Sequence, residues 1–84
     1  MFVIKDEWHA EPIGEYASRG EAVAELRRLA ALPWDDAPNK CPCRSWRGCG
    51  RRYHLIEYDS DWRSLGDEAL LDVSAKETVW LRAP

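Results

Sequence analysis

The chain has 84 residues, of which 45% are hydrophobic and 32% charged, and it contains five tryptophans. This length supports one hydrophobic core, so we expect a single domain spanning residues 1–84. The aromatic content excludes a largely disordered chain. The net charge of −3 argues against a generally basic nucleic-acid-binding protein.

The first residues and the distribution of apolar segments indicate the compartment. Three apolar residues, Phe2 to Ile4, are followed by Lys5 and Asp6, which is too short an apolar run for a secretory signal. No segment has the roughly 18 apolar residues that a membrane span requires. We therefore expect a cytoplasmic protein with reduced cysteines and no membrane association.

The N-terminal sequence predicts a hairpin. Residues Phe2 to Trp8 are led by β-branched and aromatic residues and predict a strand. A turn at residues 9–12 and a short strand at residues 13–16 would follow. Pro12 would place the second strand at an edge of the sheet or start it.

A helix is predicted next. Ser18 and Glu21 match a capping box, with serine as the N-cap and glutamate three residues later. Apolar residues then recur at the spacing of an amphipathic helix that lies on a sheet. Pro33 would end the helix.

The segment from residue 34 to residue 51 is a long irregular connection. Connections of this length inside a compact domain are usually functional, pinned to the rest of the fold, or disordered. Trp34 and Trp46 argue against disorder.

The C-terminal part predicts three further strands. Residues 52–59 predict a strand, residues 60–68 a polar loop, and residues 69–74 and 78–82 a hairpin with Val73, Val79 and Leu81 on one face. The predicted fold is therefore α+β, with one amphipathic helix packed on a mostly antiparallel sheet in the order ββαβββ.

Three cysteines and a histidine lie close together in the long connection and just after it. We expect Cys41, Cys43, Cys49 and His54 to bind a zinc ion, because zinc is held by four Cys or His ligands and can stabilise a small fold. The Cys-x-Cys spacing is tighter than that of usual ligand pairs. His9 would replace His54 if the first hairpin folds over the loop.

Two other interpretations of the cysteines stay open. Cys43 and Cys49 would serve a thiol-redox protein, with neighbouring arginines lowering the thiol pKa and Cys41 as the resolving thiol. No Cys-x-x-Cys motif supports a thioredoxin-like site. Alternatively, the cysteines pack as small hydrophobic residues.

The same connection holds the basic stretch of this acidic chain. Between Asp36 and Glu57 there is no acidic residue, and five cations fall there. We expect a partner-binding surface made of Lys40, Arg44, Trp46, Arg47, Arg51 and Arg52. The partner would be an acidic protein surface or the phosphates of a nucleic acid, since cations and exposed rings suit both. The uneven charge also favours self-association into a homo-oligomer.

No glycine-rich phosphate loop, His-Glu-x-x-His motif or pair of catalytic carboxylates is present. We therefore expect a non-enzymatic binding domain, with the thiol-redox protein as the alternative.

A spaced pattern runs from Trp34 to Asp59. It consists of Trp34, Ala37-Pro38-Asn39, Pro42-Cys43, Trp46, Cys49-Gly50-Arg51, Tyr53 and Glu57-Tyr58-Asp59. In these residues the chain resembles a small family of uncharacterised bacterial proteins, and with the preceding helix the likeness covers most of the chain. The resemblance implies no activity. The family pattern includes Cys43 and Cys49 but neither Cys41 nor His54, which implies that a four-ligand set would be particular to this sequence.

Overall fold

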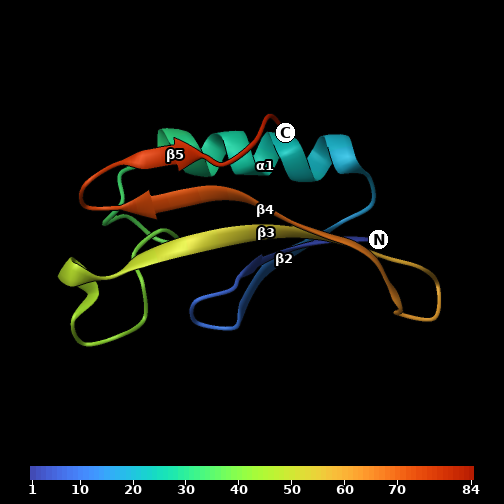
Figure 1. Ribbon diagram of the computed structural model, residues 1–84, viewed down its shortest axis with the longest axis horizontal. Helices are drawn as coiled ribbons and strands as arrows, with labels where there is room; N and C mark the ends of the chain where they lie inside the picture. The colour runs from blue at the N-terminus through green and yellow to red at the C-terminus, as the bar shows by residue number, and fades with distance from the viewer.

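The computed structural model describes residues 1–84 and confirms the predicted fold class, one helix on a five-stranded antiparallel sheet (Figure 1). The elements along the chain are β1 (Phe2–Asp6), β2 (Glu11–Tyr16), α1 (Arg19–Ala31), β3 (Gly50–Tyr58), β4 (Ser64–Ser74) and β5 (Thr78–Trp80). The strand order in the sheet is β2-β1-β3-β4-β5, and every neighbouring pair is antiparallel. The central strand, β3, begins directly after the cysteine loop.

Helix α1 begins where the sequence predicts. The Ser18 hydroxyl accepts a hydrogen bond from the Glu21 backbone N–H at 3.2 Å and so caps the helix. Ala22, Leu26 and Leu29 are buried on the face of the helix that meets the sheet. Most of the stability of such a helix comes from this packed apolar face rather than from intrinsic propensity.

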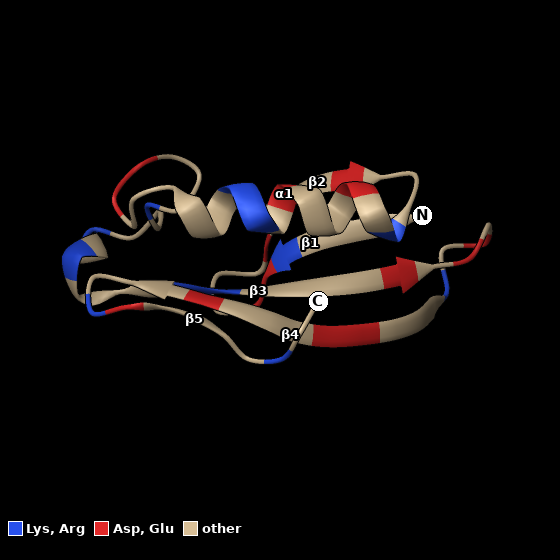
Figure 2. Ribbon diagram, turned by 90° about the horizontal axis from the view of Figure 1, so that it is seen from above, with Lys and Arg blue, Asp and Glu red and all other residues tan.

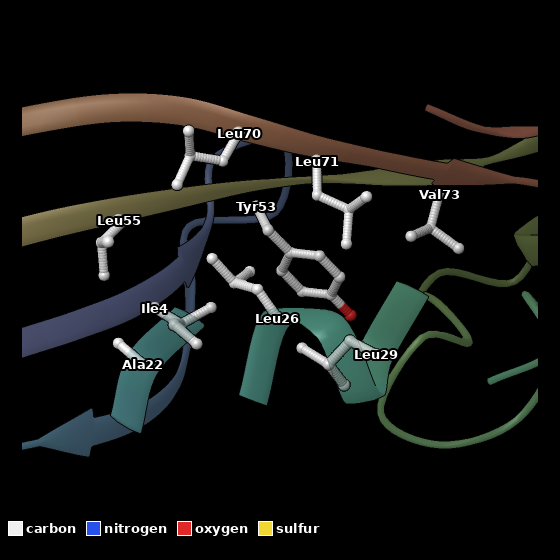
Figure 3. Packing of buried hydrophobic residues seen from close by; sticks show 9 residues of the cluster. All are labelled: Ile4, Ala22, Leu26, Leu29, Tyr53, Leu55, Leu70, Leu71 and Val73. Atoms are coloured by element: carbon white, nitrogen blue, oxygen red, sulfur yellow. The ribbon is translucent and has the colours of Figure 1, made fainter. Parts of the chain in front are cut away.

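The core forms between the helix and one face of the sheet (Figure 3). Its nine buried side chains are Ile4, Ala22, Leu26, Leu29, Tyr53, Leu55, Leu70, Leu71 and Val73. Tyr53 and Leu55 lie two residues apart on β3 and therefore point to the same face, as strand geometry requires.

Two details of the C-terminal prediction are wrong. Strand β4 begins at Ser64, inside the segment expected to be a polar loop, because Gly66 and Asp67 pair with β3 through backbone groups although both residues are exposed. Val73 pairs with Thr78, whereas Val79 pairs with Asp72. Val73 and Val79 therefore lie on opposite faces, since successive residues of a strand alternate.

Asn39 ties the long loop to both the helix and the sheet. The side chain is only 2% exposed. Its amide donates to the backbone oxygen of Leu29 at 2.8 Å, which satisfies a carbonyl at the end of α1. Its side-chain oxygen accepts a hydrogen bond of 2.8 Å from the Tyr53 hydroxyl. Burial raises the pKa of Tyr53, so this hydroxyl keeps the proton that it donates.

The structure contains no helix with both the length and the apolar character needed to cross a bilayer.

Candidate metal centre

Three segments meet at one end of the sheet: the β1–β2 turn, the loop before β3 and the β4–β5 turn (Figure 1). The loop contributes Cys41, Cys43 and Cys49, and the β1–β2 turn contributes His9. The four ligand atoms of these residues lie within 4.8 Å of one another. All three cysteines are free thiols. The four residues form a candidate metal-binding cluster.

The distances within the cluster suit tetrahedral coordination. The sulfur atoms of Cys41 and Cys43 are 3.8 Å apart, and Nε2 of His9 lies 3.2 Å from the sulfur of Cys49. Zinc–sulfur bonds of about 2.3 Å in a tetrahedron place two sulfurs about 3.8 Å apart. The side chains therefore already approach the separations that a bound ion would impose.

His54 is not part of this cluster, which corrects the sequence-based ligand set. Its Nδ1 lies 2.6 Å from Oδ1 of Asp67 on the neighbouring strand β4. His54 follows Tyr53 on β3, and the alternation of a strand turns it away from the face that Tyr53 occupies. The histidine comes instead from the first hairpin, the alternative that the sequence left open.

A buried carboxylate orients His9. Oδ2 of Asp6, whose side chain is 0% exposed, lies 2.6 Å from Nδ1 of His9. This contact places the proton on Nδ1, so the Nε2 lone pair faces the cysteines. Metal-binding histidines usually donate the second ring N–H to a carboxylate, a backbone carbonyl or a water, and this contact fixes the tautomer and the ring orientation. The hydrogen bond to Asp6 is also the main reason that the pKa of His9 is raised.

The other contacts of Asp6 hold it in place. The carboxylate accepts hydrogen bonds from the backbone N–H groups of Trp8 and Arg52, both at 3.1 Å. It also pairs with Nη1 of Arg51 at 3.0 Å. Sequence reasoning missed Asp6, and its only signal was an acidic residue three positions before a histidine.

Arg51 is a structural residue, which corrects its predicted role in partner binding. Its side chain is 3% exposed and its guanidinium donates to the backbone oxygens of Asn39 and Lys40 at 3.2 and 2.8 Å. It also pairs with Glu11 at 3.2 Å. A buried charge with this many partners is satisfied internally, and it fastens the loop to β1 and β2.

Three of the other predicted partner-binding residues have partners within the chain. Arg52 donates two hydrogen bonds to the Asp72 carboxylate, at 2.8 and 2.7 Å. The Lys40 ammonium and the Arg47 guanidinium lie 4.4 and 5.0 Å from the ring centroid of Trp46.

The predicted partner-binding residues of the loop differ in exposure. Arg44 is exposed, as are Lys40 and Arg47. Trp46 is half-buried, with its ring centroid 5.3 Å from that of Trp34. Of the predicted surface, Lys40, Arg44 and Arg47 therefore remain accessible on the loop.

Cys41 and Cys43 differ in acidity. Hydrogen bonding, most of all with Cys49, lowers the pKa of Cys43 to about 7. Burial raises the pKa of Cys41 to about 12. Cys43 therefore ionises at lower pH than Cys41, and thiolates are the form that binds metals and attacks disulfides.

The turn that carries His9 has one unusual backbone angle. Ala10 has a φ of 51°, in the left-handed region where a residue with a Cβ costs about 1–2 kcal/mol. The strained residue directly follows His9, the candidate ligand. It therefore belongs to the turn geometry that brings the imidazole over the loop.

Comparison of this chain with protein-family models, with curated proteins and with solved structures finds no match. The assignment of the cluster therefore rests on the identity, separation and hydrogen bonding of its side chains.

Proposed function

We propose that the protein binds one zinc ion through His9, Cys41, Cys43 and Cys49, and that the ion fixes the loop of a small, non-enzymatic binding domain in the reducing cytoplasm. The observation that carries this proposal is the convergence of four donor atoms within 4.8 Å, one of them on a histidine already oriented by a buried carboxylate.

The donor set selects the metal and its role. Thiolate and imidazole ligands suit zinc, whereas magnesium and calcium prefer oxygen. Four protein ligands would fill the tetrahedron and leave no open position for a catalytic water. A structural role also fits the size of the chain, because small domains often need a metal to supplement a limited core.

The exposed cations of the loop support the binding role. Arg44, Arg47 and Lys40 take part in no ion pair with a carboxylate, and the Lys40 ammonium lies over the Trp46 ring. Such unpaired charges attract acidic protein surfaces or phosphates, with attraction that falls as salt rises. With zinc in place, these side chains would project from a fixed backbone.

Thiol-redox chemistry is the second candidate function. The lowered pKa of Cys43 and the nearby sulfurs of Cys41 and Cys49 favour it. An oxidant such as hydrogen peroxide would take two electrons and two protons from Cys43 and Cys49 and leave a disulfide, itself being reduced to water. Zinc and the disulfide exclude each other at these sulfurs.

The test is native mass spectrometry of protein purified under reducing conditions, with zinc quantified per chain. We expect one zinc in the wild type and in His54→Ala, and none in His9→Ala or Cys43→Ser at the same chelator concentration. His54→Ala is the matched control because it removes an imidazole outside the cluster. A wild type without zinc, or equal loss in both histidine variants, would refute the proposal.

The redox function is tested by measuring the mass of the same samples after exposure to air. A mass lower by two hydrogens in metal-free protein, absent from Cys43→Ser, would favour the redox function. An unchanged mass would remove it.

A further inference from the structure

A groove lies beside the candidate metal centre, between the loop and the β4–β5 turn. It has a volume of about 320 Å³, and its walls include Trp8, Arg47, Cys49, Gly50, Ser74 and Lys76. Small-molecule sites in proteins range from about 300 to 1,000 Å³, so the groove has room for one small ligand. Cys49 belongs to both the candidate metal-binding cluster and the wall of the groove, so the two sites are adjacent.

The charge of the groove is positive. None of its lining residues is acidic, and Arg47 and Lys76 line it from the loop and from the β4–β5 turn. Both side chains are exposed, and neither forms an ion pair with a carboxylate. Figure 2 shows basic residues on the loop and the β4–β5 turn at this end of the molecule, next to acidic residues of the same two segments, and acidic residues on β3 and β4 at the other end. The two cations of the lining therefore favour an anion within the groove itself.

The aromatic wall of the groove is held in a defined position. Trp8 is 52% exposed, yet the Arg52 guanidinium lies 5.0 Å from its ring centroid and is itself held by Asp72. A side chain at Gly50 would place its Cβ 3.3 Å from the indole, so the ring lies close against the β3 backbone. A supported and half-exposed indole is suited to stacking with a planar group.

We propose that this groove binds a nucleotide, with its phosphate between Arg47 and Lys76 and its base stacked on Trp8. The nucleotide is either free or one unit of a single-stranded nucleic acid, since both present the same phosphate and base. This inference rests on the proposed function, because zinc at Cys49 would fix the backbone that carries Arg47 and the floor of the groove.

An acidic peptide satisfies only half of the site. Its carboxylates would pair with Arg47 and Lys76, but a carboxylate side chain leaves the exposed indole of Trp8 without a stacking partner. The combination of two cations with an aromatic face matches a phosphate linked to a base. The small size of the groove also excludes double-stranded nucleic acid, whose recognition needs an extended surface.

The experiment uses zinc-loaded protein, a fluorescent thymidine decamer, adenosine monophosphate as competitor and a fluorescent glutamate decamer, at low and at raised salt. The variants are Trp8→Leu and Arg47→Glu. Their matched controls are Trp62→Leu, since Trp62 is 55% exposed but lies outside the groove, and Arg27→Glu, on the exposed face of α1.

We expect Trp8→Leu to weaken binding of the thymidine decamer about 5- to 150-fold, the loss of one base stack, and Trp62→Leu to leave it unchanged. Arg47→Glu should weaken binding and reduce its dependence on salt, unlike Arg27→Glu. If adenosine monophosphate displaces the thymidine decamer, a free nucleotide is sufficient for binding. If the decamer binds but adenosine monophosphate does not displace it, the ligand is a single-stranded nucleic acid.

The proposal is overturned if neither nucleotide binds, if Trp8→Leu and Trp62→Leu have equal effects, or if only the glutamate decamer binds. The zinc content of each sample separates this outcome from failure of the proposed function. Zinc-loaded protein that binds no nucleotide refutes the groove assignment alone, whereas wild-type protein that never holds zinc refutes the proposed function.

Discussion

At Asp6, a fully buried carboxylate accepts hydrogen bonds from His9, from Arg51 and from two backbone amides. The same side chain therefore orients the candidate ligand and neutralises the arginine that fastens the loop. Removal of a partner from a buried charge pair leaves the remaining charge unsatisfied, which is costly. Asp6 thus connects the orientation of the candidate ligand His9 to the stability of the loop.

The substitution Asp6→Asn tests this connection. We expect zinc affinity to fall about 10- to 100-fold, because an amide orients the histidine less well than a carboxylate does. The measurement is competition with a zinc chelator of known affinity, with circular dichroism to verify the fold. Glu11→Gln is the control, since Glu11 pairs with Arg51 but does not contact His9. Equal losses in both variants would assign the effect to Arg51 alone.

The individual residues of the candidate site differ in how far the sequence could predict them. The three cysteines are close in sequence, and proximity in the chain was enough to find them. His54 was favoured over His9 for the same reason, although strand alternation directs it toward Asp67. The importance of Asp6 and the burial of Arg51 depend on contacts between residues 45 positions apart, which spacing does not reveal.

At the scale of elements, the helix and the first hairpin were predictable because local signals specify them. The Ser18 cap and the apolar stripe act within a few residues. The first part of β4 was missed because its residues from Ser64 to Glu68 are polar or exposed and are held by pairing with β3. Backbone pairing leaves no hydrophobic pattern in the sequence of a strand segment when neither of its faces is buried.

Two glycines of the β3–β4 pair provide a matched test of packing next to the site. A Cβ at Gly50 would lie 2.7 Å from the backbone oxygen of Val73, whereas a Cβ at Gly66 would have no neighbour within 4 Å. We expect Gly50→Ala to lower the free energy of unfolding by about 1–3 kcal/mol, since overpacking shifts the backbone. Gly66→Ala should change it little or raise it, because alanine restricts the unfolded chain.

Urea denaturation of zinc-loaded protein measures both variants. Because Gly50 follows Cys49, Gly50→Ala should also weaken zinc binding. If the two variants were equally stable and bound zinc equally, the close approach at Gly50 would have no energetic role.

At the scale of the whole molecule, the core lies between one helix and one face of the sheet, and the candidate metal centre lies beyond it at one end. The metal would therefore join the β1–β2 turn to the loop where the apolar core does not reach. A ligand that binds only the folded state stabilises it by mass action, so zinc should raise the melting temperature.

The pH dependence of that stabilisation follows from proton competition. Zinc requires three thiolates and a neutral imidazole, so its effect on the melting temperature should grow from about pH 6 to about pH 8. In metal-free protein the sign is opposite for His9. Asp6 raises the pKa of His9 above 6.5, so the stability that this pair contributes is present below pH 6.5 and is lost as pH rises through the raised value.

Melting temperatures measured with zinc and with a chelator, at several pH values, test these two opposite dependences of stability on pH. His9→Ala should flatten the metal-free slope near neutral pH and reduce the zinc effect. An effect of zinc that did not change with pH would contradict coordination by thiols and imidazole.

The separation of His9 from the cysteines has a consequence for synthesis on the ribosome. The histidine emerges 40 residues before Cys49, and β1 cannot complete its pairing until β3 has followed the loop. A nascent chain therefore presents its cysteines to the cellular zinc supply while the first hairpin still lacks a neighbour. Coordination by all four ligands would then coincide with the pairing of β3 with β1, before β4 and β5 complete the sheet, so metal delivery would accompany the first long-range pairing of the new chain.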